Sequence, residues 1–412
     1  MTKLMILGAG NCQLNAIKRI KSLGYDVVVS DNRIDSPGKA LADISVLADT
    51  FSYEASFVEA KKHGIHGIMT SGTDQPVYTV SKIAEAMKLN TFLSPETAFL
   101  VTNKKAMKEQ FTRSDIKTAP YAFIKQSFKD EELNFEPPYV VKPLDSQGQR
   151  GIFKLYSKED VRVHFDEVIK YSALDEIIVE SFYENKEVTV NGWVSGGKVT
   201  VLAITDRVTF HSDEHIGVCI AHEYPSIHLE RYEKDIMEMT YQICSGFEIN
   251  EGPIYFQYLV GSDGVYVNEI ACRIGGAYED ITIPYVTGVD ILDMVIEGSL
   301  KEAYDTSVLN QYVYDTKQVY STQLYFCKPG KVTDITDLNE MKSLDCILDI
   351  ACHYEIGDTI GLTENASQRA GYIIITGEDE LDLRRNIEMV YDQFKVMDDT
   401  ENLLIRGKRY YR

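Results

Sequence analysis

Over the first hundred residues, short apolar runs alternate with segments in which apolar positions recur every three or four residues. The runs predict strands, and the recurring positions predict helices that bury one face. The expected strands cover 3–7, 26–30 and 66–70, and the expected helices cover 11–23, 54–63 and 76–88. Because strands and helices alternate, we expect a parallel sheet with crossover helices over residues 1–100.

The pattern changes at about residue 101, where β-rich segments become dominant after a helix over TNKKAMKEQF. A hairpin that turns at Ser262-Asp263-Gly264 lies between helices expected near 229–246 and 289–299. The last hundred residues combine strands in STQLYFCK and GYIIITG with a helix at about 379–394. The fold class is therefore predicted to be α/β at the start of the chain and α+β afterwards.

The first expected strand ends in a glycine turn, LGAGNCQ. Together with Asp31 at the end of the second strand, this turn partly matches the fingerprint that binds dinucleotides. The fingerprint requires a third glycine where this chain has Gln13. Three uses of the turn stay open: a dinucleotide site, an anion site at the helix N-terminus, or a tight turn without a ligand.

Two downstream segments place charged residues at strand ends. Lys142 ends an apolar strand in YVVKPLDSQGQRG and precedes a glycine-bearing loop at 145–151. Such a loop either folds over phosphates, with the lysine neutralising charge, or is an exposed hairpin loop. Glu180 and Glu187 flank the end of a later strand. They either hydrogen-bond the amino group and ribose of a nucleotide or lie solvated at a strand edge.

The hairpin GPIYFQYLVGSDGVYVNEIACRIGG carries the sharpest chemical signal. Its turn brings Gln257 and Glu269 near each other across the two strands. Two oxygen donors on one face suit Mg²⁺, with phosphates and water completing the coordination. Strict alternation places Asn268 on the opposite face from Glu269. Arg273 follows, and its guanidinium can hold a carboxylate or phosphate through two hydrogen bonds.

Composition narrows the expected partners and compartment. The 412 residues carry a formal net charge of −21, and phosphate-backbone binding needs concentrated positive charge, so we expect no nucleic-acid partner. No apolar run reaches the length of a membrane span. The seven cysteines form no C-x-x-C pair, which is typical of reduced thiols. We therefore expect a cytoplasmic protein that acts on small molecules.

Taken in order, these segments resemble the ATP-grasp superfamily of carboxylate–amine ligases. LGAGNCQ, DVVVSDN and GIMTSGTDQPV are similar to the Rossmann-like domain of that family. TNKKAMK, YVVKPLDSQGQRG, IIVESFYENKEVTV and VNEIACRIGG are similar to the motifs of its ATP-binding domain, and the purine-biosynthetic and biotin-carboxylase-like members look most similar. The resemblance implies a Rossmann-like domain at 1–100 and an ATP-grasp domain at 101–305 with a mobile lid at about 115–180. It also implies a C-terminal α+β domain at 306–412, packed on the ATP-grasp core.

The resemblance further implies a site for ATP and Mg²⁺. The residues implied to bind ATP are Lys104, Lys142, Asp145, Ser146, Gln147, Gly148, Gly151, Glu180, Ser181, Phe182 and Glu187. Gln257 and Glu269 match the magnesium ligands, while Lys142 and Arg273 match catalytic residues that steady the transferred phosphate. Ala271 stands where many members have a second asparagine ligand, so the number of metal ions stays open.

The implied reaction transfers the γ-phosphate of ATP to a carboxylate, after which an amine attacks the acyl phosphate. With ATP bound downstream, the glycine turn becomes free for the carboxylate or the amine. The expected substrate contacts are Gly10, Gln13, Asp74, Arg207, Gly275 and Gly276.

Two other functions stay open: an NAD(P)-dependent dehydrogenase built on the first domain, and a non-catalytic ATP-binding regulatory protein. The missing third glycine argues against the dehydrogenase, and the absence of ADP release with any substrate would favour the regulatory protein. Enzymes of this family are often dimers, so a homodimer is the assembly to test.

Overall fold

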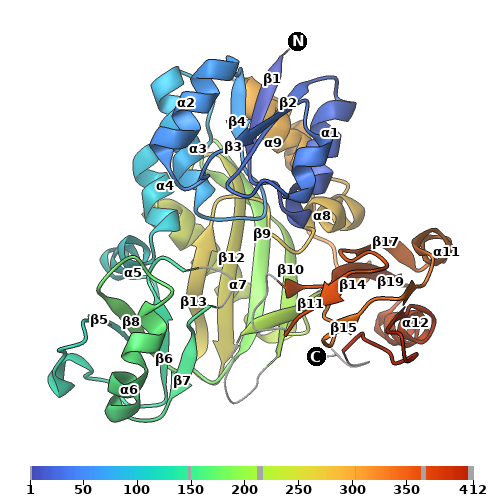
Figure 1. The fold of residues 1–412 in the computed structure, drawn as a ribbon. Helices are drawn as coiled ribbons and strands as arrows, with labels where there is room; N and C mark the ends of the chain where they lie inside the picture. The colour runs from blue at the N-terminus through green and yellow to red at the C-terminus, as the bar shows by residue number, and fades with distance from the viewer. Residues whose placement is uncertain (1, 147–149, 211–216, 302, 363–367, 407–412) are drawn as a thin grey trace.

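The computed structural model describes residues 2–146, 150–210, 217–301, 303–362 and 368–406 (Figure 1). The chain begins with a parallel sheet in the strand order β3-β2-β1-β4. Its strands are β1 (Lys3–Leu7), β2 (Asp26–Asp31), β3 (Ile44–Leu47) and β4 (Gly67–Met69). Its helices are η1 (Asn11–Gln13), α1 (Leu14–Ser22), η2 (Pro37–Leu41), α2 (Tyr53–His63), α3 (Pro76–Met87) and α4 (Pro95–Thr102).

Strand β1 is buried on both faces, as expected for a parallel sheet covered by helices. Leu4 and Ile6 pack into one cluster with apolar residues of α1 and of α9 (Ile291–Leu300). Met5 and Leu7 pack on the other face, with residues of α2 and α3. The predicted parallel sheet with crossover helices is confirmed, and the structure adds β3 and α4, which the apolar pattern did not predict.

The middle of the molecule is an eight-stranded sheet in the order β13-β12-β9-β10-β11-β14-β19-β17. Its first strands in the chain are β9 (Lys186–Ser195), β10 (Lys198–Phe210), β11 (Val218–Tyr224), β12 (Gly252–Gly261) and β13 (Gly264–Ala271). The helices that accompany them are α7 (Leu229–Gly246), α8 (Glu279–Thr287), α9 and α10 (Ser307–Gln311). Apolar residues of α7 form the largest core cluster together with β9, β12 and β13.

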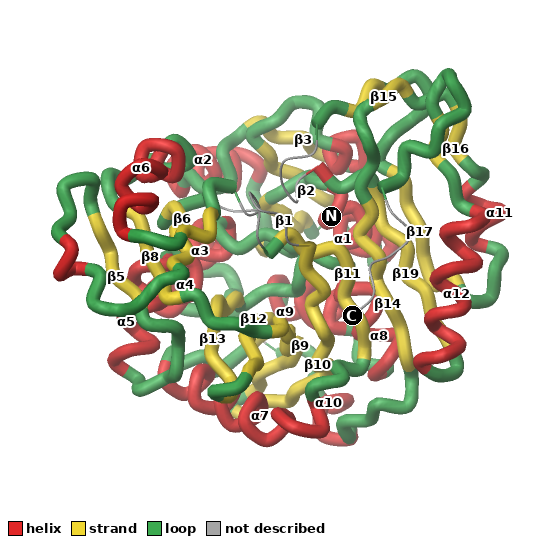
Figure 2. The backbone as a smooth tube through the Cα atoms, turned by 90° about the horizontal axis from the view of Figure 1, so that it is seen from below, coloured by secondary structure: helices red, strands yellow, loops and turns green. Residues whose placement is uncertain are grey.

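A smaller four-stranded sheet, ordered β5-β8-β6-β7, lies beside β13. Its elements are α5 (Lys104–Arg113), β5 (Tyr121–Ile124), η3 (Asp130–Glu132), β6 (Tyr139–Pro143), β7 (Phe153–Leu155), α6 (Lys158–Ile169) and β8 (Ile177–Ser181). Seen from below, this unit and the C-terminal elements lie on opposite sides of the central strands (Figure 2).

The C-terminal strands continue the central sheet. Strand β14 pairs with β11, with Thr322 opposite His222, and β19 and β17 follow outward. The elements here are β14 (Val319–Tyr325), β15 (Gly330–Lys331), β16 (Asp334–Ile335), α11 (Leu338–Lys342), β17 (Ile347–Cys352), β18 (Thr359–Ile360), β19 (Gly371–Gly377), α12 (Glu380–Gln393) and β20 (Val396–Met397). The domain boundaries expected at 100 and 305 stay predictions.

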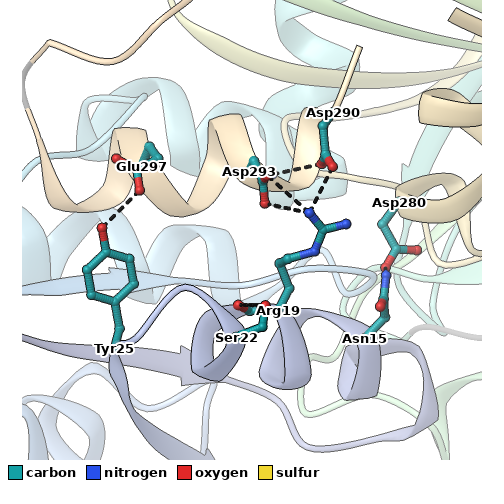
Figure 3. Close-up of polar contacts among 8 residues, drawn as sticks. All are labelled: Asn15, Arg19, Ser22, Tyr25, Asp280, Asp290, Asp293 and Glu297. Atoms are coloured by element: carbon teal, nitrogen blue, oxygen red, sulfur yellow. Dashed lines mark hydrogen bonds and ion pairs between the residues drawn. The ribbon is translucent and has the colours of Figure 1, made fainter. Parts of the chain in front are cut away.

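Helix α1 is fastened to α8 and α9 through one polar face (Figure 3). Arg19 donates to Asp290 and Asp293 at 3.0 Å, and Asn15, one helical turn earlier, donates to Asp280 at 2.7 Å. Tyr25 extends the same face by donating to Glu297. These contacts link segments more than 250 residues apart in sequence and fix the glycine turn before α1 against the loop before α8.

No helix in the described residues is long and apolar enough to cross a membrane.

Candidate active site

A cavity of about 850 Å³ lies between the four-stranded sheet and the β12–β13 hairpin. Strands with buried apolar faces form its wall, but many of the side chains that line it are charged or carry an amide. The polar residues that line it include Lys104, Lys108, Lys142, Lys154, Glu180, Ser181, Glu187, Arg207, Gln257, Asn268 and Glu269. The structure therefore gathers most of the residues implied to bind ATP and magnesium, and a volume of this size suits a nucleotide.

A buried acid between two lysines forms the inner wall of this cavity. Glu180 on β8 pairs with Lys142 on β6 and, at 2.6 Å, with Lys108 on α5. Burial by itself would raise the pKa of Glu180, but the two lysines outweigh it and lower this pKa to about 2. The triad carries a net positive charge, which favours an anionic ligand in the cavity.

Stability is expected to depend on Glu180 in acid. Because its folded-state pKa lies below the ordinary value of 4.5, it contributes stability above pH 4.5 and loses that contribution as the pH falls toward 2. The drop in pKa corresponds to about 3 kcal/mol. Glu180→Gln should therefore destabilise the protein strongly at pH 7 in urea unfolding, and the difference from wild type should shrink below pH 4.5. The exposed Glu167→Gln serves as the matched control, and an equal loss at pH 7 and pH 3 would contradict the assignment.

The predicted phosphate loop starts beside α5. Lys104 Nζ donates to the carbonyl oxygen of Ser146 at 2.7 Å, and Asp145 accepts from the backbone of Ala173 at 2.9 Å. Gly151 ends the loop at a φ of +72°, where a Cβ would meet the Tyr171 ring at 2.8 Å. Gln147 and Gly148 lie outside the described residues.

Three residues predicted to contact the nucleotide are already engaged within the protein. The N–H groups of Ser181 and Phe182 donate to the carbonyls of Pro120 and Pro138 at 2.8 Å, so a nucleotide base cannot receive hydrogen bonds from them. Glu187 pairs with Arg207, whose other amino group donates to the Gly217 carbonyl at 3.0 Å. Arg207 thus lies on the wall of the large cavity, beside the acid predicted to bind ribose.

The β12–β13 hairpin places its two oxygen donors as predicted, because Gln257 and Glu269 are direct partners in the ladder. The next pair is Tyr258 with Val267, so the register shifts and Asn268 has no partner of its own. This bulge corrects the prediction that Asn268 faces away from Glu269: both line the cavity, and Asn268 accepts from Lys142 at 3.3 Å. Strict alternation failed because one extra residue sits in the strand.

The residues present fit a magnesium ion that is held jointly with a nucleotide. No group of three or more His, Cys, Asp or Glu side chains in the described residues could hold a metal alone. Gln257, Glu269 and the bulged Asn268 supply only one carboxylate and two amides around the cavity wall. Mg²⁺ commonly takes one or two protein oxygens and completes its octahedron with phosphates and water.

The chain leaves β13 toward the N-terminal sheet. Arg273 is 7% exposed, pairs with Asp74 at 2.5 Å, and has its guanidinium carbon 4.6 Å from the Tyr255 ring centre. Its Nε is buried without a hydrogen-bond partner in the described part of the chain. The Gly72 N–H donates to the Ile274 carbonyl at 3.1 Å, and a Cβ on Gly276 would lie 2.8 Å from the Gly72 oxygen. Segment 72–74, which holds the predicted substrate residue Asp74, therefore lies against segment 273–276, which holds Gly276, at one backbone junction.

The glycine turn proves to be filled by protein. Gln13 is 2% exposed and donates to the Ser71 carbonyl at 2.6 Å and to Thr73 Oγ1 at 3.1 Å. A Cβ on Gly8 would lie 3.1 Å from the Gln13 amide nitrogen. Asp31 accepts from the Ala9 N–H at 2.9 Å, so it holds the turn instead of a ribose. The Gln13 amide thus fastens the turn to residues 71–73, and the predicted contact of Gln13 with substrate stays a prediction.

Sequence reasoning did not assign several of the cavity's polar residues, among them Lys108, Lys154 and Asn268. Lys108 lies one helical turn after Lys104 on α5, a spacing that puts both on one face and could have revealed it. Lys154 on β7 has its Nζ 3.5 Å from the Phe182 ring centre, across the cavity rim. Asn268 was missed because a bulge gives no signal in a single sequence.

Known amino acid ligases are similar to this chain in sequence. Residues 322–397 match the family model described as L-amino acid ligase C-terminal domain 2. The L-arginine-specific L-amino acid ligase of Bacillus subtilis is 24% identical over 319 residues, which cover 72% of this chain and 71% of that protein.

Two solved structures share the fold over nearly the whole chain. The L-amino acid ligase from Bacillus licheniformis superposes with a TM-score of 0.82 at 18% identity, covering 97% of this chain and 99% of that one. The phosphoribosylglycinamide synthetase from Anaerococcus prevotii superposes with a TM-score of 0.77 at 21% identity, covering 97% and 100%. The relatives, the fold and the grouped motif residues all point to ATP-dependent ligases of the ATP-grasp type, to which this chain is similar in sequence and structure.

Proposed function

We propose that this ligase joins the carboxylate of one amino acid to the amino group of another and releases ADP and phosphate. The match at 322–397 and the Bacillus subtilis relative support amino acids over purine precursors as substrates. The same relatives support a ligase over the dehydrogenase and the regulatory protein that the sequence left open. The substrates in the names of those relatives belong to those proteins, so the proposal gives only the class of both substrates, amino acids.

One observation carries the proposal: segment 269–276 spans two sites within eight residues. It starts at Glu269 in the large cavity and ends at Gly276 against Gly72 of the N-terminal part. A phosphate donor bound in the cavity and a carboxylate bound at Arg273 would therefore lie next to each other. Phosphoryl transfer needs mainly such positioning and charge neutralisation, without a covalent enzyme group.

The proposed roles follow from where each side chain lies. Lys104, Lys142 and the start of loop 145–151 would bind the phosphates of ATP, with Glu187 near its ribose. Gln257 and Glu269 would hold Mg²⁺, which supplies neutralisation of the phosphate charge when bound. Arg273 would hold the carboxylate through its free Nε–H, while the Asp74 partner keeps the guanidinium in place. Gly10 and Gly275 would line the same substrate side.

The direct test is a screen for ADP release with ATP, Mg²⁺ and pairs of L-amino acids. We expect release that requires both amino acids and yields a product whose mass equals their sum less one water. ADP release that is independent of added amino acids, or that occurs only with ribonucleotide amines, would contradict the proposal.

Gln13→Ala should act on substrate binding indirectly. Because the substitution leaves the buried Ser71 carbonyl without its donor, we expect a loss of about 1–3 kcal/mol in stability. The loop that carries Asp74 would loosen, so the KM of an amino acid should rise while the KM of ATP changes little. The matched control is Asn11→Ala on the same turn. Equal effects on both KM values, measured by ADP release, would contradict this positioning role.

A further inference from the structure

The backbone junction between Gly72 and Gly276 lies outside the large cavity, and three parts of the chain meet there. The N-terminal part contributes Cys12, and a Cβ on Gly72 would lie 2.8 Å from its sulfur. The central part contributes the loop around Gly276, whose Cβ would lie 2.8 Å from the Gly72 oxygen. Cys12, Gly72 and Gly276 are all partly exposed, so the junction is open to solvent on one side.

The C-terminal part closes this junction through an aromatic contact. Tyr278 stacks on Tyr372 of β19 with ring centres 3.5 Å apart, and its hydroxyl lies 3.3 Å from His353 Nε2. Tyr278 has a φ of +67°, a conformation that costs energy for a residue with a bulky side chain. The surrounding contacts must hold it there, which fixes the C-terminal strands against the loop that follows Arg273.

Arg369 comes from the C-terminal part, two residues before β19, and is half-buried. Its only described hydrogen bond runs from Nη2 to the carbonyl of Cys219 at 3.3 Å, and its Nε is buried without an acceptor. No carboxylate within the described ranges lies in ion-pair distance of it. By contrast, Arg207 and Arg273 each pair with an acid. Among the described residues, Arg369 therefore keeps donor capacity that no acceptor uses.

The charge of Arg369 reaches the junction. Burial raises the pKa of Cys12 and of Glu279, and the guanidinium of Arg369 acts against this effect at both residues. It acts in the same direction on Tyr278. Packing places Arg369 at the same loop, because Cys219, whose carbonyl accepts from Arg369, lies in one buried cluster with Ala277 and Tyr278.

We propose that Arg369 binds the carboxylate of the amino acid that supplies the amine. The inference rests on the proposed function, in which this carboxylate takes no part in the reaction and keeps its charge. A charge that leaves water needs a partner, and a guanidinium matches a carboxylate with two parallel hydrogen bonds. Arg369 does not line the ATP cavity, so it fits the carboxylate that is not phosphorylated. Arg369 is thus a specificity-determining residue that separates amino acids from simple amines.

The test compares an acceptor with its neutral analogue. The acceptor is the most active amine-supplying L-amino acid of the ADP screen, and the analogue is its carboxamide. In the wild type, the KM of the carboxamide should exceed that of the acid by about 10–100-fold. Arg369→Gln should raise the KM of the acid by the same factor and leave the KM values of the carboxamide, the donor and ATP within twofold. Arg369→Lys should restore part of the loss.

Arg385→Gln, on the exposed face of α12, is the matched control and should change nothing. An equal KM for the acid and the carboxamide in the wild type would overturn the inference even if Arg369→Gln did not fold. Equal increases for both acceptors in the variant would also overturn it. Absence of ADP release with every amino-acid pair would instead overturn the proposed function, so the two failures are distinguishable.

Discussion

Replacing Lys142 by alanine is expected to lower kcat/KM for ATP by about 10²–10³-fold. Lys142 lies on the cavity wall, where its amino group pairs with Glu180 and donates to Asn268, and the proposal assigns the phosphates to this cavity. Transfer of a phosphoryl group develops charge that a fixed cation stabilises in a partly dry site. The measurement is ADP release at varied ATP, together with the rise in Tm on adding ATP and Mg²⁺.

The control for this prediction is Lys170→Ala, because Lys170 is exposed at the end of α6 on the same unit. Glu180 keeps Lys108 as a partner when Lys142 is removed, so the variant should fold. A Lys142→Ala protein with unchanged turnover and an unchanged Tm response would remove the basis for the ATP assignment.

The second large effect is expected at Glu269. Glu269→Gln removes the only carboxylate of the proposed magnesium pair and should lower kcat/KM by about 10²-fold or more. Gln257→Glu, its partner across the ladder, should act in the opposite direction by lowering the Mg²⁺ concentration needed for half-maximal activity. Activity titrated against Mg²⁺ measures both shifts.

Asp263→Asn is the control, because it removes a negative charge from the exposed turn of the same hairpin. If Glu269→Gln, Gln257→Glu and Asp263→Asn all gave the same magnesium titration as the wild type, the hairpin would not be the metal site. If Gln257→Glu changed the Mg²⁺ concentration needed for half-maximal activity while Glu269→Gln did not, Gln257 alone would be the ligand.

Periodicity predicted the N-terminal sheet well because its signals are local. The buried run at Leu4–Leu7 and the amphipathic spacing of α1 need no information from elsewhere in the chain. Strand β3 was missed because it is a four-residue strand at the sheet edge in which only Val46 is buried. The continuation of the central sheet into β14 and β19 was also not predicted, since antiparallel pairing between β11 and β14 leaves no trace in a single sequence.

The site could be predicted where residue type and spacing are themselves the signal. The short turn brings Gln257 and Glu269 near each other, as predicted, and the bulge at Asn268 then sets them directly opposite. The Asn268 bulge, the Lys108–Glu180 pair and Arg369 depend on tertiary packing, so no local pattern marks them. Gln13 shows the same limit: its position was noticed, but only the structure shows that its amide holds residues 71–73.

The central claim is that this protein uses ATP to phosphorylate the carboxylate of a bound donor amino acid. Transfer of a carboxylate oxygen to phosphate tests this claim most directly. The donor amino acid is labelled with ¹⁸O in its carboxylate and incubated with ATP, Mg²⁺ and the acceptor. If the carboxylate attacks the γ-phosphate and the amine then displaces phosphate, one labelled oxygen must leave with each inorganic phosphate. We predict that mass spectrometry finds this label in the phosphate in step with product formation. Unlabelled phosphate released with the product would contradict the account.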